Sequence, residues 1–325
     1  MIGYIQAPNI NPVMIDLPGP MAISWYGVMY LIGLLFAYLF VLYHIRRKRI
    51  ELDNEQFTDI LIRIFLGVII GGRLGFCLFV NPSYYLRNPL RILAVWEGGM
   101  YFFGGLILAM ILPYFYIRRI RRNYFDVGDL IIIPAPIALA FGRLGNFING
   151  EFWGRPSTAP WAMVFDTVPR TNWFPADESW VQEFIAAIGM RVPAGQELVN
   201  LSRHPVQLYE LFFEGVLLFF VLLLFRNIGK PKPRGSILSL FMLAYGGFRF
   251  WIEFYREPTS HSAIVAGDWF TLGMLFSVPM VLAGAAGLLL AFKYNKPNML
   301  YTATIDQSSA ASRKYKDKRQ RRKRR

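Results

Sequence analysis

One short run of the chain combines a cation, two amides and a carboxylate at the end of an apolar stretch. Arg143, Asn146, Asn149 and Glu151 lie there, and mostly apolar residues and glycine stand between them. A guanidinium binds a phosphate through paired hydrogen bonds, and a carboxylate can orient that guanidinium or accept a proton. Such groups in apolar surroundings indicate a functional site.

A second set of charges has helical spacing. Arg249 and Glu253 are four residues apart and Arg256 follows three residues later, so all three share one helix face. Glu210 and Glu214 repeat the four-residue spacing in another apolar stretch. These residues can meet the first run only if their segments pack together.

The composition says which elements carry these residues. Of 325 residues, 54% are hydrophobic and only 17% are charged, which is unusual for a soluble chain of this length. Several windows are apolar over the length that crosses a bilayer. We predict an all-α polytopic membrane protein with about seven transmembrane helices. The predicted spans are 23–43, 60–80, 98–117, 130–150, 206–225, 237–255 and 269–292.

The distribution of Lys and Arg predicts the orientation. Basic clusters follow the first, third, fifth and seventh predicted spans, which places the N-terminus outside and the C-terminus in the cytoplasm. We expect an external lead-in at 1–22, a membrane domain at 23–292 with an external loop at 151–205, and a basic tail at 293–325. The net charge of +14 comes mostly from that tail, which indicates a cytoplasmic end near anionic lipid rather than nucleic-acid binding.

The long external loop is rich in tryptophan, with Trp161, Trp173 and Trp180. These aromatics could lie at the lipid–water interface. The loop could equally be an ordinary packed module outside the membrane. The sequence leaves both readings open.

The rise of a helix indicates where the buried charges meet. At about 1.5 Å per residue, Arg143 and Arg73 lie roughly 20 Å above the cytoplasmic ends of their spans, and Arg249 lies about 18 Å above. Independent spans therefore bring their charges to similar heights in the outer leaflet. We predict one polar pocket between the helices, open toward that leaflet.

Two readings of this pocket are possible. Arg143 with Glu151, and Arg249 with Glu253, could be structural ion pairs that simply neutralise each other. Against this, arginines outnumber the nearby carboxylates in the second and fourth predicted spans. We therefore favour a site whose surplus guanidinium groups bind an anion.

Several motifs together resemble the prolipoprotein diacylglyceryl transferase family. They occur in the family's order along most of the chain, although the basic tail lies outside the resemblance. The motifs are Gly142-Arg143-Leu144-Gly145-Asn146-Phe147-Ile148-Asn149-Gly150-Glu151 followed by Gly154, Ile23-Ser24-Trp25-Tyr26-Gly27, Gly71-Gly72-Arg73-Leu74-Gly75, Trp96-Glu97-Gly98-Gly99-Met100, Arg203-His204-Pro205-Val206-Gln207-Leu208-Tyr209-Glu210, and Tyr245-Gly246-Gly247-Phe248-Arg249-Phe250-Trp251-Ile252-Glu253-Phe254.

This resemblance implies a reaction. A diacylglyceryl group moves from phosphatidylglycerol to the lipobox cysteine thiol of a prolipoprotein, a thioether forms, and glycerol phosphate leaves. The expected partners are phosphatidylglycerol, prolipoprotein signal peptides and membrane lipids, without nucleic acid. The expected location is the bacterial inner membrane, as a multi-pass protein with its active site toward the periplasmic leaflet.

The resemblance also assigns candidate residues. Arginines would stabilise the leaving phosphate, and carboxylates would orient them or assist removal of the thiol proton. The expected catalytic residues are Arg143, Glu151, Arg249 and Glu253. The expected substrate-binding residues are Arg143, Asn146, Asn149, Gly154, Tyr26, Arg73 and Tyr245.

One position departs from the family. Many members carry a histidine, considered a candidate base, where this chain has Phe103. Among the remaining histidines, His204 is the best-placed possible base, although a structural role is the more common reason for such a residue. A non-catalytic relative that binds phosphatidylglycerol or prolipoprotein is the alternative that Phe103 supports.

Two other functional classes are less well supported. A small transporter is disfavoured because the charges gather in the outer half of the membrane and no internal repeat is apparent. Cys77 is the only cysteine, and the three histidines are scattered, so the sequence contains no metal-ligand spacing. We expect no metal and no cofactor.

Overall fold

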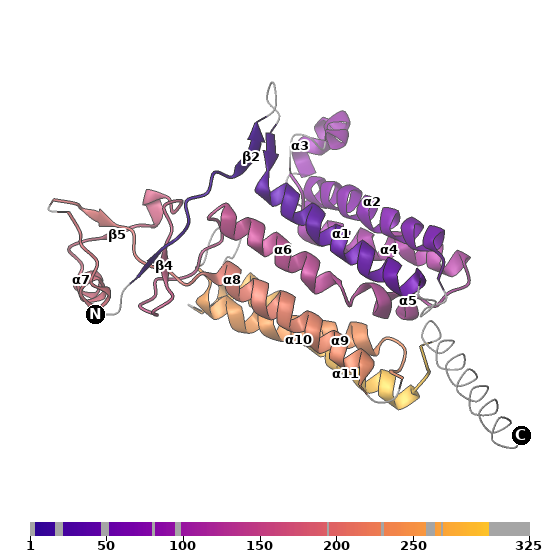
Figure 1. Cartoon of the computed structure of the whole chain (residues 1–325). Coiled ribbons are helices and arrows are strands. Elements are labelled where there is room, and N and C mark those ends of the chain that lie inside the picture. Colours follow the sequence, from indigo (N-terminus) through magenta and orange to yellow (C-terminus); the bar gives the residue numbers. More distant parts are fainter. Residues whose placement is uncertain are drawn as a thin grey trace, which may run out of the picture. The chain divides into compact units, whose positions relative to one another are not determined.

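The computed structural model describes residues 4–16, 22–46, 52–79, 82–94, 99–193, 195–228, 231–257, 264–267 and 269–298 (Figure 1). The chain divides into two compact units. Unit 1 comprises Met1–Val41 and Ile131–Lys296, and unit 2 comprises Leu42–Leu130 and Pro297–Arg325.

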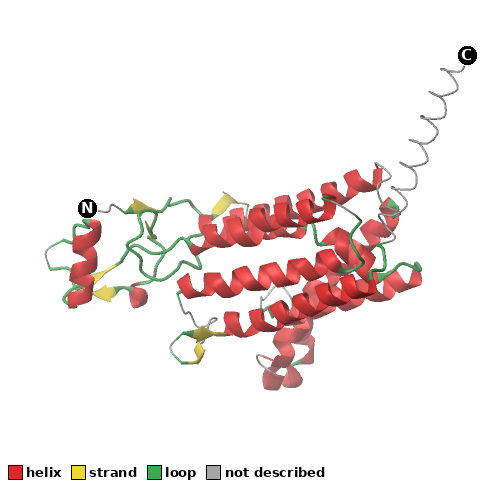
Figure 2. Cartoon of the chain, turned by 90° about the horizontal axis from the view of Figure 1, so that it is seen from below, coloured by secondary structure: helices red, strands yellow, loops and turns green. Residues whose placement is uncertain are grey.

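Helices occupy every segment predicted to span the membrane (Figure 2). The helices of these segments are α1 (Trp25–Arg46), α2 (Asn54–Phe79), α4 (Phe102–Arg119), α5 (Tyr124–Ile131) followed by α6 (Ala135–Ile148), α8 (Val206–Glu210) continued by η4 (Leu211–Leu217) and α9 (Leu218–Asn227), α10 (Ser236–Ile252) continued by η5 (Glu253–Tyr255), and α11 (Leu272–Tyr294). Shorter helices are α3 (Pro82–Arg87), η1 (Pro89–Leu93), η3 (Arg170–Asn172) and α7 (Ser179–Ile188).

Among the described residues, five helices are long and apolar enough to cross a membrane, or six if α5 and α6 form one broken span. A polytopic helical membrane protein is therefore confirmed, whereas the count of seven and the orientation stay predictions. The expected continuous helix over 130–150 is wrong. Pro134 and Pro136 interrupt it, because proline removes a backbone donor and clashes with the preceding turn.

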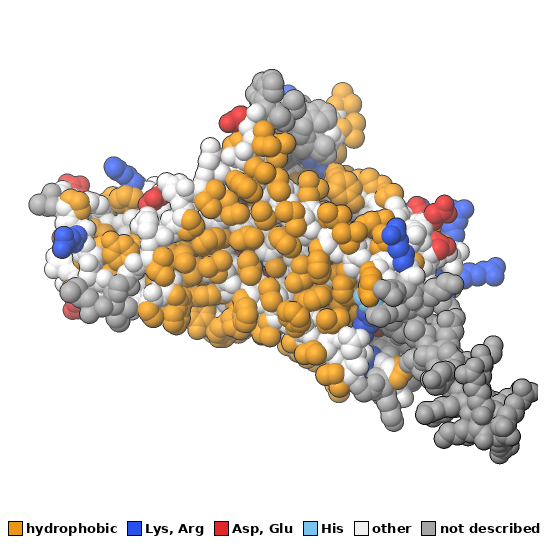
Figure 3. All heavy atoms as spheres, viewed as in Figure 1, with side chains coloured by type: hydrophobic (Ala, Val, Ile, Leu, Met, Phe, Trp, Pro, Cys, Tyr) orange, Lys and Arg blue, Asp and Glu red, His pale blue; other side chains and the backbone are white. Residues whose placement is uncertain are grey.

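The flanks of the helices expose large apolar side chains (Figure 3). Leu31 of α1, Leu282 and Leu289 of α11, and Leu224 of α9 are each more than half exposed. A water-soluble protein rarely leaves so much apolar surface uncovered, whereas lipid solvates it without cost. The exposed side chains thus agree with a membrane environment.

Glycines set the helix packing in unit 1. The helices α10 and α11 lie side by side (Figure 1). A Cβ added to Gly246 would lie 3.0 Å from Val281, and one added to Gly284 would lie 2.4 Å from the backbone of Leu243. Such close backbone approach is typical of membrane helix pairs. Gly247 takes no part in this contact, since a Cβ there would meet no atom within 4 Å.

Glycines also allow close helix packing in unit 2. The helices α2 and α4 pack together, and a Cβ added to Gly71 would lie 2.2 Å from the carbonyl oxygen of Gly104. The motif Gly71-Gly72-Arg73-Leu74-Gly75 therefore serves helix packing in this unit.

The described part of segment 151–205 folds as a small module of short strands with the helices η3 and α7. Its strands are β4 (Met163–Val164), which pairs in parallel with β1 (Ile5–Gln6), and β5 (Phe174–Pro175), which pairs with β6 (Leu198–Val199). Two further hairpins lie elsewhere, β2 (Val13–Asp16) with β3 (Ala22–Ser24), and β7 (Ile264–Ala266) with β8 (Phe270–Thr271).

The module has apolar cores of its own. Phe165 and Trp153 are buried in one of them, with Trp173 packed against it, and Val181 and Leu201 are buried in the other. By contrast, Trp161 and Trp180 are 54% and 43% exposed. A packed module is thus confirmed for the aromatics that form these cores, whereas contact of Trp161 and Trp180 with the lipid–water interface stays a prediction.

Candidate active site

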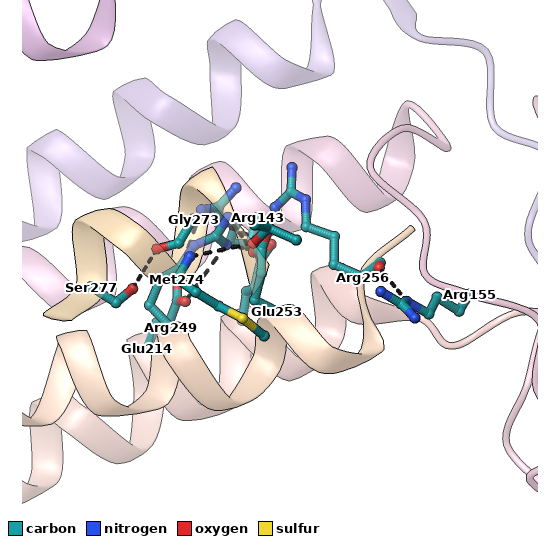
Figure 4. Close-up of polar contacts among 11 residues, drawn as sticks. Arg143, Arg155, Glu214, Arg249, Glu253, Arg256, Gly273, Met274 and Ser277 are labelled. Carbon is teal, nitrogen blue, oxygen red and sulfur yellow. Dashed lines mark hydrogen bonds and ion pairs between the residues drawn. The ribbon is translucent and has the colours of Figure 1, made fainter. Parts of the chain in front are cut away.

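The centre of the candidate site is the fully buried carboxylate of Glu210, at the end of α8 in unit 1. Three guanidinium groups contact it. The Nε of Arg143, on α6, lies 3.2 Å from Oε2, and Nη1 of Arg256 donates to Oε1 at 3.0 Å. Nη1 of Arg249, on α10, also donates to Oε1. Glu210 therefore gathers arginines from separate segments around one point. Figure 4 shows the three arginines Arg143, Arg249 and Arg256 together with Glu214 and Glu253.

A second carboxylate, that of Glu214, lies one turn further along the same span. It is 1% exposed and faces the same two helices. Its oxygens are 3.8 Å from Nη2 of Arg143 and 3.9 Å from Nη1 of Arg249. These separations are ion pairs without hydrogen bonds, so Glu214 is held less tightly than Glu210.

The third carboxylate is that of Glu253, in the last turn of the α10 span. It lies 3.0 Å from Nη2 of Arg249 and accepts a hydrogen bond from the hydroxyl of Thr271 at 3.0 Å. Gly273, in the first turn of α11, provides the space, because a Cβ there would lie 2.6 Å from the Glu253 carboxyl carbon. The expected partnership of Arg249 and Glu253 is confirmed (Figure 4).

Two expectations about these charges are wrong. Arg143 has no ion pair with Glu151 in the structure, because its guanidinium is bound to Glu210 and Glu214 instead. The guanidinium groups are also not in surplus, since the partners of the three arginines are the three carboxylates Glu210, Glu214 and Glu253. Arginines outnumber carboxylates within single spans, but the carboxylates that bind them come from other spans.

The Arg143 and Arg249 side chains still reach an accessible surface. They are 24% and 18% exposed, while the carboxylates beneath them are buried. Each guanidinium has five donor hydrogens and does not use all of them on these carboxylates. An anion approaching from the exposed side can therefore bind guanidinium donors that are already oriented.

The amides of the first run form an adjoining cluster. Asn146 and Asn149 both donate to Oε1 of Glu151, at 3.2 and 3.0 Å. The side chain of Gln207 donates to the backbone oxygen of Glu151 at 2.7 Å, which ties this cluster to the helix that carries Glu210. Tyr26 lies within electrostatic range of both Glu151 and Arg143. Glu151 thus orients the amides rather than an arginine.

Gly154 fixes the backbone beside Arg256. It forms an antiparallel bridge with Arg256, and its N–H donates to the carbonyl of His204 at 2.9 Å. A Cβ at Gly154 would lie 2.5 Å from the carbonyl oxygen of Tyr255, so no larger residue fits. The neighbouring Arg155 also donates to the backbone oxygen of Arg256 at 3.0 Å. The structure therefore gives Gly154 a packing role.

His204 lies outside the arginine–glutamate cluster. Its Nδ1 is 2.9 Å from the hydroxyl of Tyr209, which also accepts a hydrogen bond from the indole of Trp161 at 2.6 Å. Burial lowers the pKa of His204 below its ordinary value of 6.5. This neutral, hydrogen-bonded ring has the environment of a structural histidine, and its role as a base stays a prediction.

The remaining candidates divide between the two units. Tyr245, on α10, lies within electrostatic range of Glu214, Arg143 and Arg249. Arg73 belongs to unit 2, where it is buried and its guanidinium donates to the backbone oxygens of Ile92 and Arg91. Its binding role stays a prediction, and the side chain of Phe103 lies outside the described residues.

Sequence reasoning missed three members of the cluster as site residues, Glu210, Glu214 and Arg256. A signal was present, because Glu210 and Glu214 are the only charges between Pro205 and Phe225. Two carboxylates on one face of an otherwise apolar span require cationic partners from another helix.

The helices have apolar flanks, and a buried arginine–glutamate cluster lies between them. These two features define the class of the protein, which is a polytopic membrane protein with a buried ionic site. Comparison with known proteins refines it. The family model of prolipoprotein diacylglyceryl transferase matches residues 12–290, and the chain belongs to this family.

Curated relatives agree with that assignment over nearly the whole chain. The phosphatidylglycerol–prolipoprotein diacylglyceryl transferase of Aliivibrio fischeri (strain MJ11) is 40% identical over 321 residues, covering 97% of this chain and 98% of the relative. The protein of the same name from Photobacterium profundum is 41% identical over 291 residues, covering 90% and 97%. That of Cronobacter sakazakii is 41% identical over 299 residues, covering 90% and 96%.

Proposed function

We propose that this chain transfers the diacylglyceryl group of phosphatidylglycerol to the cysteine thiol of a prolipoprotein. Family membership supports the reaction, and the names of the relatives supply both substrates. The observation in the structure that carries the proposal is that Arg143 and Arg249, from separate helices, share the Glu210 carboxylate and are both partly exposed.

The proposed reaction requires that these arginines stabilise the leaving phosphate. A sulfur–carbon bond forms at the glyceryl carbon, the bond from that carbon to the phosphate oxygen breaks, and glycerol phosphate departs with an additional negative charge. Donors that are already fixed around the developing charge stabilise the transition state more than the ground state. Glu210 and Glu253 fix the two guanidinium groups, and Arg256 completes the cluster.

The amide cluster fits the polar part of the lipid headgroup. Asn146 and Asn149 would bind glycerol hydroxyls or phosphate oxygens, and Glu151 would orient both amides. Tyr26 and Tyr245 would be further hydrogen-bond partners.

We further propose seven spans in a bacterial inner membrane, with the N-terminus outside, the C-terminus in the cytoplasm and the site toward the outer leaflet. Five candidate helices and the broken pair α5–α6 support this number. The 18-residue helix α4 would be the seventh, since it is long enough for about 27 Å.

A purified-protein assay tests the function. The chain in nanodiscs with phosphatidylglycerol and a lipobox peptide should form the thioether and release glycerol phosphate. Arg143→Ala should lower turnover at least 100-fold, because removing one fixed donor from a developing charge has a cost of this order. The matched control is Arg63→Ala on α2, whose guanidinium is one-third exposed, pairs with Asp59 and stacks on the Tyr116 ring of α4, away from the cluster.

The same assay separates the alternative that Phe103 supports. A non-catalytic relative would bind phosphatidylglycerol or the peptide without releasing glycerol phosphate. Absence of release from the unmodified chain, together with recovery in Phe103→His, would favour that alternative and overturn the proposed transfer.

A further inference from the structure

The three buried carboxylates of the cluster differ in how many partners they have. Glu210 is contacted by three arginines, and Glu253 has Arg249 and Thr271. Glu214 is different, because neither of its oxygens has a hydrogen bond and its nearest guanidinium nitrogens are 3.8 and 3.9 Å away. An anionic carboxylate with so few partners in a buried place gains most from taking up a proton.

The backbone around Glu214 is also unusual. Residues Leu211–Leu217 form a π-helix within an otherwise α-helical span. A π-helical turn inserts extra backbone into a helix and is frequently found at functional sites. Gly215 within this turn packs against Ala140 of α6, where an added Cβ would lie 2.5 Å from the alanine Cβ. The turn thus presses Glu214 toward the helix that carries Arg143.

Charged and titratable groups face Glu214 from every neighbouring segment. Arg143 faces it from α6, Arg249 and Tyr245 face it from α10, and Arg256 follows that helix. Glu210 lies one turn away on its own span. Arg143 and Arg249 are the two that cover the Glu214 carboxylate, and they are also the partly exposed arginines to which the proposed function assigns the phosphate.

We propose that Glu214 accepts the proton of the substrate thiol. The inference rests on the proposed function. When the lipid phosphate binds Arg143 and Arg249, their long contacts to Glu214 break and the carboxylate becomes free to take a proton. Many family members have a histidine where this chain has Phe103. In this chain the proton acceptor is therefore a carboxylate inside the arginine cluster.

The charges balance in this step. The thiol proton moves to the Glu214 carboxylate, which becomes neutral, and the thiolate attacks the glyceryl carbon. The carbon–oxygen bond breaks, and the phosphate gains the negative charge that Glu214 has lost. The two guanidinium groups thus exchange one anionic partner for another, and the net charge of the buried site stays constant.

The test compares a thiol with a selenol. A selenol is ionised at neutral pH and needs no proton acceptor, whereas a free cysteine thiol has a pKa of about 8.5. Glu214→Gln, in the full chain in phosphatidylglycerol nanodiscs, should lower turnover of a cysteine lipobox peptide at least 100-fold at pH 7. With the selenocysteine peptide, the loss should shrink to less than about fivefold, since Gln has nearly the shape of Glu. Asp59→Asn on α2 is the matched acid-to-amide control.

Other results would overturn the proposal. Equal losses with both peptides would make Glu214 a positioning residue, and no loss would remove it from the reaction. If Glu214→Gln fails to fold, the unmodified chain still decides. Its turnover with the cysteine peptide should fall as the pH is lowered through the titration of Glu214, and this acid limb should be absent with the selenocysteine peptide. An acid limb common to both would exclude Glu214. A chain that releases no glycerol phosphate with either peptide would instead sink the proposed function.

Discussion

Glu210 and Glu214 are the same residue type, four positions apart on one apolar span, yet their surroundings give them different chemistry. Glu210 is surrounded by three guanidinium groups and stays an anion that organises them. Glu214 has only long contacts, so a proton can replace its cationic partners. At the scale of residues, the number of hydrogen-bond donors around a buried carboxylate decides whether it orients arginine side chains or accepts a proton.

The His204 ring supplies the pH-dependent prediction at this scale. Burial lowers its pKa below 6.5, so its contribution to stability is complete above pH 6.5 and is lost as the pH falls through the pKa in the folded protein. His204→Gln should therefore make the thermal stability of the protein fall less steeply on acidification below pH 6.5. Thermal unfolding in detergent between pH 5 and 7.5 measures this.

Turnover of the same variant should stay within about tenfold of the unmodified chain, because Gln can still hydrogen-bond Tyr209. A loss of 100-fold or more with an intact fold would identify His204 as the base and would count against Glu214.

At the scale of elements, the site depends on how closely α10 and α11 approach each other. Glu253 ends one helix span, and Thr271 and Gly273 begin the next. Thr271 caps α11 by accepting a hydrogen bond from the N–H of Met274, and the same hydroxyl donates to Glu253. The capping residue Thr271 thus orients the Glu253 carboxylate, and this carboxylate in turn orients Arg249.

Two glycines of this helix pair give a matched test. Gly273→Ala should lower turnover at least tenfold, because the new Cβ would lie 2.6 Å from the Glu253 carboxyl carbon and would move that carboxylate away from Arg249. Gly247→Ala should keep activity, since its Cβ meets nothing within 4 Å. Turnover and thermal stability of both variants are the measurements. Equal turnover of the two variants would show that turnover does not depend on the position of the Glu253 carboxylate.

At the scale of the whole molecule, the chain builds its polar site entirely from unit 1. The cluster Glu210, Glu214, Glu253, Arg143, Arg249 and Arg256 lies in that unit, together with the 151–205 module and its own cores. Unit 2 packs α2 on α4 through glycines and holds Arg73. The module reaches the site through the bridge between Gly154 and Arg256.

Orientation is the prediction that belongs to this scale. The only cysteine is Cys77, so Cys77→Ser provides a cysteine-free background. In intact cells, Thr171→Cys in the module should react with a membrane-impermeant thiol reagent from outside, whereas Lys293→Cys in the last turn of α11 should react only after the membrane is opened. The reverse pattern would invert the proposed topology and place the site toward the cytoplasm.

The sequence alone determined the class of this protein and the segments of its helices. Long apolar stretches have one stable form in lipid, since every backbone group must find its partner within the segment. The motifs indicated the family, and the spacing of Arg249 and Glu253 indicated their ion pair. These inferences succeed because they depend on local composition and spacing.

Only the tertiary structure decided which charge meets which. Arg143 stands eight residues before Glu151 but pairs with Glu210 and Glu214, on a helix more than sixty residues away. The π-helical turn at Leu211–Leu217 was likewise visible only in the structure. Ion pairs across a helix bundle follow from the rotation and depth of each helix, and close backbone contacts between helices set both.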